Sequence, residues 1–416
     1  MSIHYAGDID SKGNAHPFRV AVRDGVSPDV TRHLENSPGI EVVDDPAIAQ
    51  AALIRSATKF MSPDAIQEWA QLMFLVRVGV GTDNIKMDLA SEAGIATMNT
   101  PGASTEAVAI RAVTFMLAWA ARLKQGTDSL AKGTWPKGDQ TVEPRELDER
   151  TLGIVGYGRI GRATAKKAAP FFGKTIFTDT QSIEGMTSMQ ELLASADVIS
   201  VHASGDTEVL TPTLLQQVRS GSLIVNTSRG GVINPAALLD CMDRGVSVAL
   251  DVFPTEGPAM FQNDTIQKIT QHPLFFGTPH TAASGSGTQK KLGLEGAGYA
   301  TAFAHHGSVN TGNIPGHTLP RMIPTERKGT GVRGVVTHPS VKGTIGRIGN
   351  IAQGLGLNIA QFCNEQGPKF GETRLAITAF DLEDAGVEEG LNVMRAIGKE
   401  ISVLRSRLLL YENGTE

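Results

Sequence analysis

Cysteine is scarce in this sequence, which has only two, Cys241 and Cys363, among 416 residues. Two distant cysteines cannot build a disulfide framework, and they supply too few thiolates for a cysteine metal site. We therefore expect a chain without a bound metal, in the reducing environment of the cytoplasm.

An excess of basic residues and a long apolar run are also missing. Lys+Arg number 38 against 43 Asp+Glu, so the formal net charge is −5, whereas nucleic-acid binders show a basic excess or stripe. No apolar run approaches the roughly 18 residues of a membrane span. The first residues lack the basic-then-apolar pattern of a secretion signal. We expect neither nucleic acid nor membrane as a partner.

Glycine, by contrast, is abundant. The 46 glycines make up about 11% of the chain, above the average of about 7%. Many of them follow short apolar runs, where tight turns and close backbone approach are needed. At roughly 150 residues per domain, the length predicts about three domains.

Short β-branched runs alternate twice with helix-sized stretches, which predicts two parallel α/β sheets. Residues 1–17 are expected to form a loose polar arm, 103–124 and 288–306 long helices, 126–149 a loop and 310–331 a linker. The strands are expected at 19–22, 40–43, 52–54, 73–76 and 95–98, and then at 152–155, 175–178, 198–202, 223–226, 247–251 and 275–278.

The last part of the chain has a different order of elements. Strands are expected at 332–337, 357–363, 372–380 and 400–404, with one helix after the first strand and another before the last. This β-α-β-β-α-β order predicts a ferredoxin-like α+β domain.

A glycine-rich turn joins a predicted strand to a predicted helix. Gly156, Gly158 and Gly161 form a GxGxxG motif directly after the apolar run 152–155. The first glycine permits a tight turn, the second lets the backbone approach a pyrophosphate, and the third lets helix and strand pack closely. Asp179 ends the next strand, where an acid binds ribose hydroxyls and repels a 2′-phosphate, so we expect NAD rather than NADP. The alternative is a packing turn without a ligand.

Three polar side chains, Arg229, Glu256 and His280, follow strands of the second series. Ligands of open parallel sheets bind at the carboxyl ends of strands, so these groups could converge beside a nicotinamide. Oxidation of a 2-hydroxy acid removes a hydride from carbon and a proton from oxygen. His280 would take the proton, Glu256 would orient and stabilise the imidazolium, and Arg229 would hold the substrate carboxylate. Asp251 would face the nicotinamide amide. Taken singly, each residue has a structural alternative as a loop-holding hydrogen bonder.

The motifs GYGRIG (156–161), NTSRGG (226–231), DVFPTE (251–256) and TPH (278–280) together resemble the D-2-hydroxyacid dehydrogenases. Within that family the chain is most similar to the 3-phosphoglycerate dehydrogenases, which begin L-serine biosynthesis by oxidising 3-phospho-D-glycerate to 3-phosphohydroxypyruvate. The resemblance implies that Arg229, Glu256 and His280 are catalytic. The implied NAD contacts are Gly156, Gly158, Arg159, Ile160, Gly161, Asp179, Thr227, Ser228, Asp251, Ala282 and Ala283.

The resemblance also implies a domain layout. A Rossmann-type NAD domain (103–291) is inserted into a flavodoxin-like substrate domain (1–102 and 292–318), and an ACT-like regulatory domain follows (319–416). Both α/β domains are doubly wound parallel sheets. The implied partners are a phosphorylated 2-hydroxy acid, L-serine as an effector, and further copies of the chain in a homodimer or homotetramer.

Residues of the first series are expected to select the substrate. Arg55 and Arg77 follow neighbouring strands beside glycine-rich turns, where cationic groups suit a phosphate, although surface ion pairs are the alternative. The full implied substrate set is Arg55, Ser56, Arg77, Gly79 and Asn99. The implied effector set in the last domain is His338, Ser340 and Asn358; the alternative is a domain kept only for assembly.

The chain departs from the family pattern at a few positions. Ser104, Ile110 and the pair Ala282-Ala283 stand where the family has Asn, Glu and a glycine pair. Two other functions remain open. One is a reductase for hydroxypyruvate, glyoxylate or 2-oxoglutarate, and the other is an NAD-sensing binding protein without catalysis.

Overall fold

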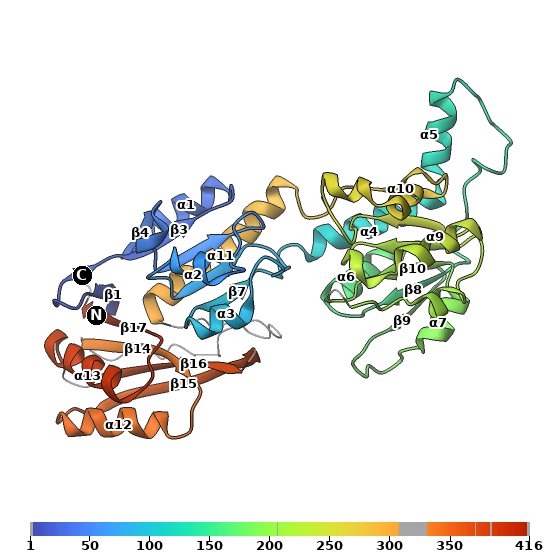
Figure 1. Ribbon diagram of the computed structural model, residues 1–416. Helices are drawn as coiled ribbons and strands as arrows, with labels where there is room; N and C mark the ends of the chain where they lie inside the picture. Colours follow the sequence, from blue (N-terminus) through green and yellow to red (C-terminus); the bar gives the residue numbers. More distant parts are fainter. Residues whose placement is uncertain (1–2, 206, 308–330, 371, 383–384, 414–416) are drawn as a thin grey trace. The chain divides into compact units, whose positions relative to one another are not determined.

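The computed structural model describes residues 3–205, 207–307, 331–370, 372–382 and 385–413, and the chain divides into two compact units (Figure 1). Unit 1 comprises Met1–Ala103 and Gln289–Glu416, and unit 2 comprises Ser104–Thr288. The predicted linker lies almost wholly outside the described residues, as does the predicted boundary at 318/319. The finer division into three domains therefore stays a prediction.

Unit 2 is built on a six-stranded parallel sheet in the order β13-β12-β11-β10-β8-β9. Its strands are buried on both faces: Leu152 and Ile154 of β8 join one apolar cluster, and Val155 joins another. Burial on both faces is typical of a parallel sheet that helices cover on each side. The strands are β8 (Thr151–Val155), β9 (Lys174–Thr178), β10 (Val198–Val201), β11 (Leu223–Asn226), β12 (Ser247–Leu250) and β13 (Phe275–Gly277).

Two helices of unit 2, α4 (Thr105–Ala120) and α5 (Leu123–Ala131), precede its first strand, and the others alternate with the strands, as the sequence predicted. The others are α6 (Arg159–Ala168), α7 (Met189–Ser195), α8 (Pro212–Leu215), α9 (Pro235–Asp243) and α10 (Asp264–Gln271). Helix α5 occupies part of the predicted loop 126–149, so that prediction was wrong there. The helix buries none of its residues, which removed the apolar periodicity that identifies a helix in a sequence.

Unit 1 holds a five-stranded parallel sheet in the order β4-β3-β5-β6-β7. This 2-1-3-4-5 order is that of doubly wound flavodoxin-like sheets. The elements are β3 (Phe18–Val22), β4 (Ile40–Val43), β5 (Ala51–Ile54), β6 (Phe74–Arg77), β7 (Ala96–Asn99), α1 (Pro28–Glu35), α2 (Pro63–Gln67) and α3 (Met87–Glu92). Helix α11 (Ser286–His306) returns after unit 2 and packs Leu292, Ala300 and Phe303 against this sheet. Segments from before and after unit 2 in the sequence thus pack together in unit 1, while the predicted domain bounds stay a prediction.

A second, antiparallel sheet of unit 1 has the order β15-β16-β14-β17-β1-β2. Its C-terminal elements follow the predicted β-α-β-β-α-β order: β14 (Gly331–Pro339), α12 (Thr344–Gly354), β15 (Ile359–Phe370), β16 (Thr373–Leu382), α13 (Val387–Glu400) and β17 (Arg405–Asn413). One face packs on α12 and α13 through Val336 and Phe380, and the other packs on β3 and α11 through Val335 and Leu409.

Two predictions for this sheet were wrong. Residues 1–17 are not a loose arm, because β1 (Ile3–Ile9) pairs with β17 and β2 (Ala15–His16) pairs with β1. The last strand does not span 400–404, because α13 continues to Glu400 and β17 starts at Arg405. Strands β1 and β17 bury the charged residues Asp8 and Arg407, and this masks the alternating pattern of a half-buried strand.

Candidate active site

The predicted phosphate-binding turn lies between β8 and α6. A Cβ at Gly156 would approach the His202 carbonyl oxygen to 2.7 Å, and one at Gly161 would approach the Gly156 oxygen to 2.1 Å. Both positions therefore require glycine. A Cβ at Gly158 meets no atom within 4 Å, so open space lies before the N-terminus of α6. Space, glycine backbone and helix N-terminus together fit a pyrophosphate.

Asp179 follows β9 and reaches this turn. Its Oδ2 accepts a hydrogen bond from the Tyr157 amide at 2.6 Å, and its Oδ1 accepts one from the Gln181 amide at 3.0 Å. Beneath the turn the Tyr157 ring stacks on Phe177 with centroids 3.8 Å apart. The acid thus stands beside the open space, where the sequence placed a ribose.

The NTSRGG segment leaves the carboxyl end of β11. Asn226 shapes it, because its Nδ2 donates to the Arg229 carbonyl at 2.8 Å while its Oδ1 accepts from the Ser228 amide and hydroxyl. A Cβ at Gly230 would lie 1.9 Å from the Phe253 carbonyl carbon, so this glycine permits the segment to contact the next loop. Sequence reasoning did not identify Asn226 as the organising residue.

Thr227 is buried, and its hydroxyl has no hydrogen-bond partner among the described residues. A buried hydroxyl normally finds a partner, so an unpaired one at the carboxyl end of β11 fits a polar group of a bound cofactor. The cofactor contacts expected at Thr227 and Ser228 stay a prediction.

His280 and Glu256 are brought together by the loops after β13 and β12. The His280 Nδ1 lies 2.8 Å from Glu256 Oε2. Their side chains are 48% and 43% exposed, so a substrate can reach the ring. Since Nδ1 contacts the carboxylate, Nε2 is the nitrogen left for a substrate hydroxyl. The two residues predicted as the acid/base and its partner are therefore in hydrogen-bond contact, and their catalytic role stays a prediction.

Asp251, also predicted as a cofactor contact, is buried with 1% exposure. Its carboxylate accepts hydrogen bonds from the Thr278 hydroxyl and from the Thr281 and Ala282 amides. Asp251 therefore joins the end of β12 to the turn that carries His280.

The predicted substrate residues lie in unit 1. Ile54 pairs with Arg77 in the register of β5 and β6, so Arg55 and Arg77 leave adjacent strand ends within one residue of each other. Asn99 ends β7 and donates to the Val80 carbonyl. The Gly79 amide donates to Thr100 Oγ1 at 2.7 Å, while Ser56 is exposed beside Arg55.

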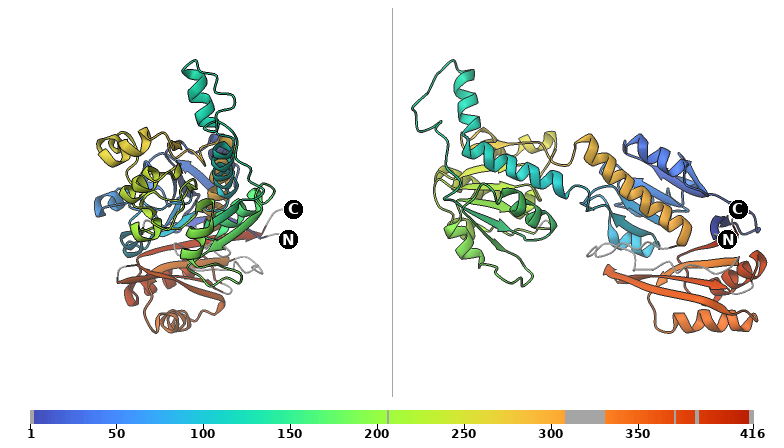
Figure 2. Two further views of the ribbon diagram at one scale, coloured as in Figure 1. Left: turned by 90° about the vertical axis from the view of Figure 1, so that its right-hand side faces the viewer. Right: turned by 180° about the vertical axis from the view of Figure 1, so that it is seen from behind.

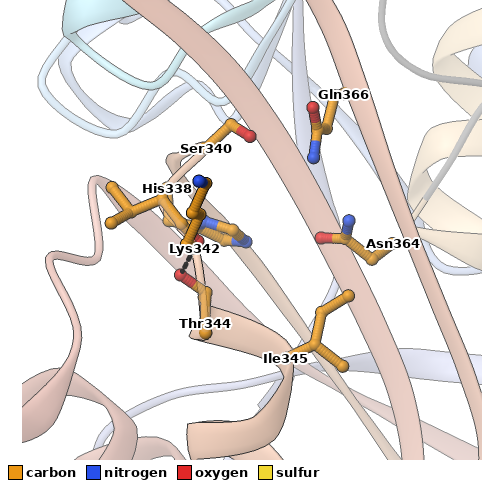
Figure 3. A pocket seen from close by; sticks show the side chains of 9 residues that line it. His338, Ser340, Lys342, Thr344, Ile345, Asn364 and Gln366 are labelled. Carbon is orange, nitrogen blue, oxygen red and sulfur yellow. Dashed lines mark hydrogen bonds between the residues drawn. The ribbon is translucent and has the colours of Figure 1, made fainter.

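A pocket in the C-terminal sheet includes two of the three predicted effector residues. His338 and Ser340 line it, and Asn364 and Gln366 of β15 face them across it (Figure 3). Asn358 is exposed before β15 and does not line the pocket. Asn364 was not found from the sequence, because only the pairing of β15 with β16 brings it there.

No three His, Cys, Asp or Glu side chains gather as metal ligands in the part of the chain that the structure describes. Within the same residues no helix is long and apolar enough to cross a bilayer.

Comparison with known proteins agrees with this geometry. The model of the D-isomer specific 2-hydroxyacid dehydrogenase NAD-binding domain matches residues 113–282, which lie within unit 2. Hydroxypyruvate reductase of Thermotoga maritima is 32% identical over 299 residues, covering 67% of this chain and 95% of that protein.

Two further likenesses are informative. D-3-phosphoglycerate dehydrogenase of Bacillus subtilis is 32% identical over 309 residues, which cover 69% of this chain but only 57% of that protein. The crystal structure of D-lactate dehydrogenase from Aquifex aeolicus, complexed with NAD and lactic acid, superposes with a TM-score of 0.60 at 23% identity. The superposition covers 68% of this chain and 95% of the lactate dehydrogenase chain, which shows that the two chains share a fold. The chain therefore belongs to the D-isomer specific 2-hydroxyacid dehydrogenases and is an NAD-dependent enzyme of that family.

Proposed function

We propose that this enzyme oxidises 3-phospho-D-glycerate to 3-phosphohydroxypyruvate with NAD, the first step of L-serine biosynthesis. The observation that carries the proposal is the pair Arg55 and Arg77 at adjacent strand ends of unit 1. Two forked cations at one sheet edge suit a phosphate, which lactate or glyoxylate does not carry.

The backbone around both arginines is firmly held. Asp24 accepts hydrogen bonds from the Arg55 amide at 2.7 Å and from Thr58. Burial alone would raise the pKa of Asp24, but these hydrogen bonds hold it below its ordinary value, so the acid stays ionised. Arg77 Nη1 donates to the Val78 carbonyl and lies where a Cβ at Gly79 would stand. Gly79 therefore gives the guanidinium its room.

In unit 2 we assign the proton transfer to His280. Nε2 takes the proton of the 2-hydroxyl, and Glu256 stabilises the resulting imidazolium through Nδ1. Arg229 holds the substrate carboxylate. Bound NAD would supply the acceptor for the hydride that leaves the substrate carbon. The residues proposed to hold it are Gly156, Gly158, Arg159, Ile160, Gly161, Asp179, Thr227, Ser228, Asp251, Ala282 and Ala283.

The test is a substrate panel followed by NADH absorbance, with NAD and NADP compared. Arg55→Ala and Arg77→Ala should raise KM for 3-phosphoglycerate about tenfold or more, the effect of one lost charge-assisted hydrogen bond. KM for an unphosphorylated 2-hydroxy acid should change little. Arg32→Ala, which removes an exposed arginine of the same unit, is the matched control. Equal effects on both substrates would remove the reason to prefer a phosphorylated one.

A second candidate activity is the reduction of hydroxypyruvate. The match to the Thermotoga hydroxypyruvate reductase, which covers 95% of that protein, favours it. Hydroxypyruvate and 3-phosphohydroxypyruvate differ only by the phosphate. The ratio of their kcat/KM values therefore decides between the two activities.

We propose further that the C-terminal module is an ACT-like domain whose pocket binds L-serine through His338 and Ser340. His338 Nε2 contacts Thr378 Oγ1, which in turn donates to Asn364 Oδ1 at 2.7 Å. Burial lowers the pKa of His338, which favours a neutral ring. Calorimetry with L-serine should show binding that Ser340→Ala weakens. D-serine is the control, and no heat at millimolar L-serine would contradict the assignment.

We propose that the enzyme forms a homodimer or homotetramer through helix α5 and the residues that follow it. Helix α5 projects from the body of unit 2 and buries none of its residues (Figures 1 and 2). Leu123, Leu130 and Trp135 expose large apolar side chains there. Exposed apolar patches of this kind mark protein interfaces. Leu123→Glu with Leu130→Glu should lower the mass measured by light scattering, while Lys124→Glu on the same helix should not.

A further inference from the structure

We propose that Asp251 and Thr278 act as one positioning device, a clamp that holds His280 in the conformation needed for proton transfer. The proposal rests on the assignment of His280 as the acid/base. Thr278 belongs to none of the expected cofactor, substrate or catalytic sets, and Asp251, expected as a cofactor contact, takes a second role through its hydrogen bonds to the turn.

Four hydrogen bonds join the turn after β13 to Asp251. Oδ1 accepts from the Thr278 hydroxyl and from the Thr281 amide at 3.0 Å, and Oδ2 accepts from the Ala282 amide at 3.0 Å. The Asp251 carbonyl accepts from the His280 amide at 2.7 Å. Residues on both sides of His280 are thus attached to a single buried residue.

His280 needs such support because its backbone is in an unfavourable region. Its φ is +51°, a left-handed value that non-glycine residues seldom adopt. Strained backbone of this kind persists only where the surroundings overdetermine it. Three donors on one buried carboxylate, together with the carbonyl, supply that constraint.

The ring itself has little other support. Within the described residues its hydrogen-bond partner is Glu256, whose side chain is itself 43% exposed. A turn that relaxed by a fraction of an ångström would carry Nδ1 away from Glu256 and change the direction of Nε2. The clamp should therefore affect the chemical step much more than the binding of NAD.

The experiment compares Thr278→Val, Thr278→Ser and Asp251→Asn in the full-length enzyme. Thr278→Val removes the hydroxyl but keeps the shape of the side chain, so kcat should fall about tenfold. The dissociation constant of NAD should stay within about twofold of the wild-type value. Thr278→Ser restores the hydroxyl and should restore kcat. Asp251→Asn replaces one acceptor oxygen with a donor group that faces a backbone N–H. Its kcat should therefore fall further than that of Thr278→Val. Hydrogen exchange of residues 278–283 should be faster in Thr278→Val and Asp251→Asn.

Thr114→Val, which removes an exposed hydroxyl bonded within its own helix, is the matched control. Wild-type kcat and exchange in Thr278→Val, or equal losses in Val and Ser variants, would overturn the clamp. So would a loss of NAD affinity with kcat unchanged. Activity is measured on whichever 2-hydroxy acid the wild type turns over, so an error in the proposed substrate does not affect the result. His280→Ala tests the acid/base assignment separately from the clamp: if this variant turns over at the wild-type rate, His280 is not the acid/base.

Discussion

Single glycines decide what the cofactor turn can hold, and two of them have opposite surroundings. Gly161 is packed against the Gly156 carbonyl, whereas a Cβ at Gly158 would point into open space. Gly158→Ala should therefore leave the melting temperature within about 2 °C while it weakens NAD binding about tenfold or more, because the methyl group enters the pyrophosphate space. Calorimetric titration with NAD and thermal unfolding measure the two effects.

Gly161→Ala is the comparison, since it should lower stability and NAD affinity together. If Gly158→Ala binds NAD as tightly as the wild type, the open space before α6 is not the phosphate site.

A partly buried histidine makes the stability of unit 2 sensitive to acid. Burial lowers the pKa of His202 to about 4 from an ordinary value near 6.5, and its Nε2 lies 2.9 Å from Ser200 Oγ. The unfolded chain binds a proton that the folded chain excludes, so stability is full above about pH 6.5 and falls as the pH drops toward 4. Between pH 7 and pH 5 the loss from this group should be about 2 kcal/mol.

His202→Gln should remove that part of the acid sensitivity, measured as the difference in urea midpoints at the two pH values. His33→Gln, at an exposed position, is the control. An unchanged difference in His202→Gln would mean that His202 does not carry the effect.

The sequence predicted the site residues that follow strand ends, and the structure explains why it missed others. Arg229, Glu256 and His280 stand in loops after apolar runs, where a polar side chain is conspicuous. Asn364 lies within a strand, and the clamp formed by Asp251 and Thr278 depends on contacts between residues 27 apart. No local pattern reports such contacts.

At the scale of elements, the C-terminal sheet of unit 1 is joined to α11 by two buried arginines. Arg407 donates to the Phe303 and Ala304 carbonyls, and Arg333 donates to the His306 carbonyl. Cationic side chains at a helix C-terminus satisfy carbonyls that have no partner within the helix. Arg407 is itself paired with Asp8 of β1, which also accepts from Tyr5 and Gln50.

Breaking this buried pair should be costly. Arg407→Leu leaves the Asp8 carboxylate buried without its charge partner, so the free energy of unfolding should fall by about 3–5 kcal/mol. Asp8→Leu combined with Arg407→Leu should recover part of the loss. Arg32→Ala, from an exposed ion pair, should change it by less than about 1 kcal/mol. Urea unfolding measures all three variants, and a double variant no more stable than Arg407→Leu would count against a buried pair.

The ion pair of Asp8 and Arg407 also explains why some strands were predicted from the sequence and strand β1 was not. Parallel strands made of unbroken apolar residues were located within about two residues. Strand β1 was missed because its buried Asp8 meets an arginine 399 positions away, so a core position carried a charged residue.

At the scale of the whole molecule, the chain inserts one compact unit into another. All proposed cofactor and acid/base residues lie in unit 2, which has its own sheet and two apolar clusters. The proposed substrate and effector residues lie in unit 1. The phosphate turn and the family motifs predicted an inserted cofactor domain, and its bounds stay a prediction. That the parallel sheet and the C-terminal sheet share one unit depends on tertiary contacts, which no local pattern in the sequence reports.

This division predicts that unit 2 folds alone. A fragment of residues 104–288 retains all six strands with helices on both faces, so it should unfold cooperatively and bind NAD within about tenfold of the full chain. It should show no dehydrogenase activity on any 2-hydroxy acid, because unit 1, with the whole proposed substrate set, is absent. Far-ultraviolet circular dichroism, thermal unfolding and NAD titration provide the measurements, with Gly158→Ala in the fragment as the binding control. A fragment that folds but does not bind NAD would show that the cofactor site needs unit 1, and the assignment of the cofactor residues to unit 2 alone would fail.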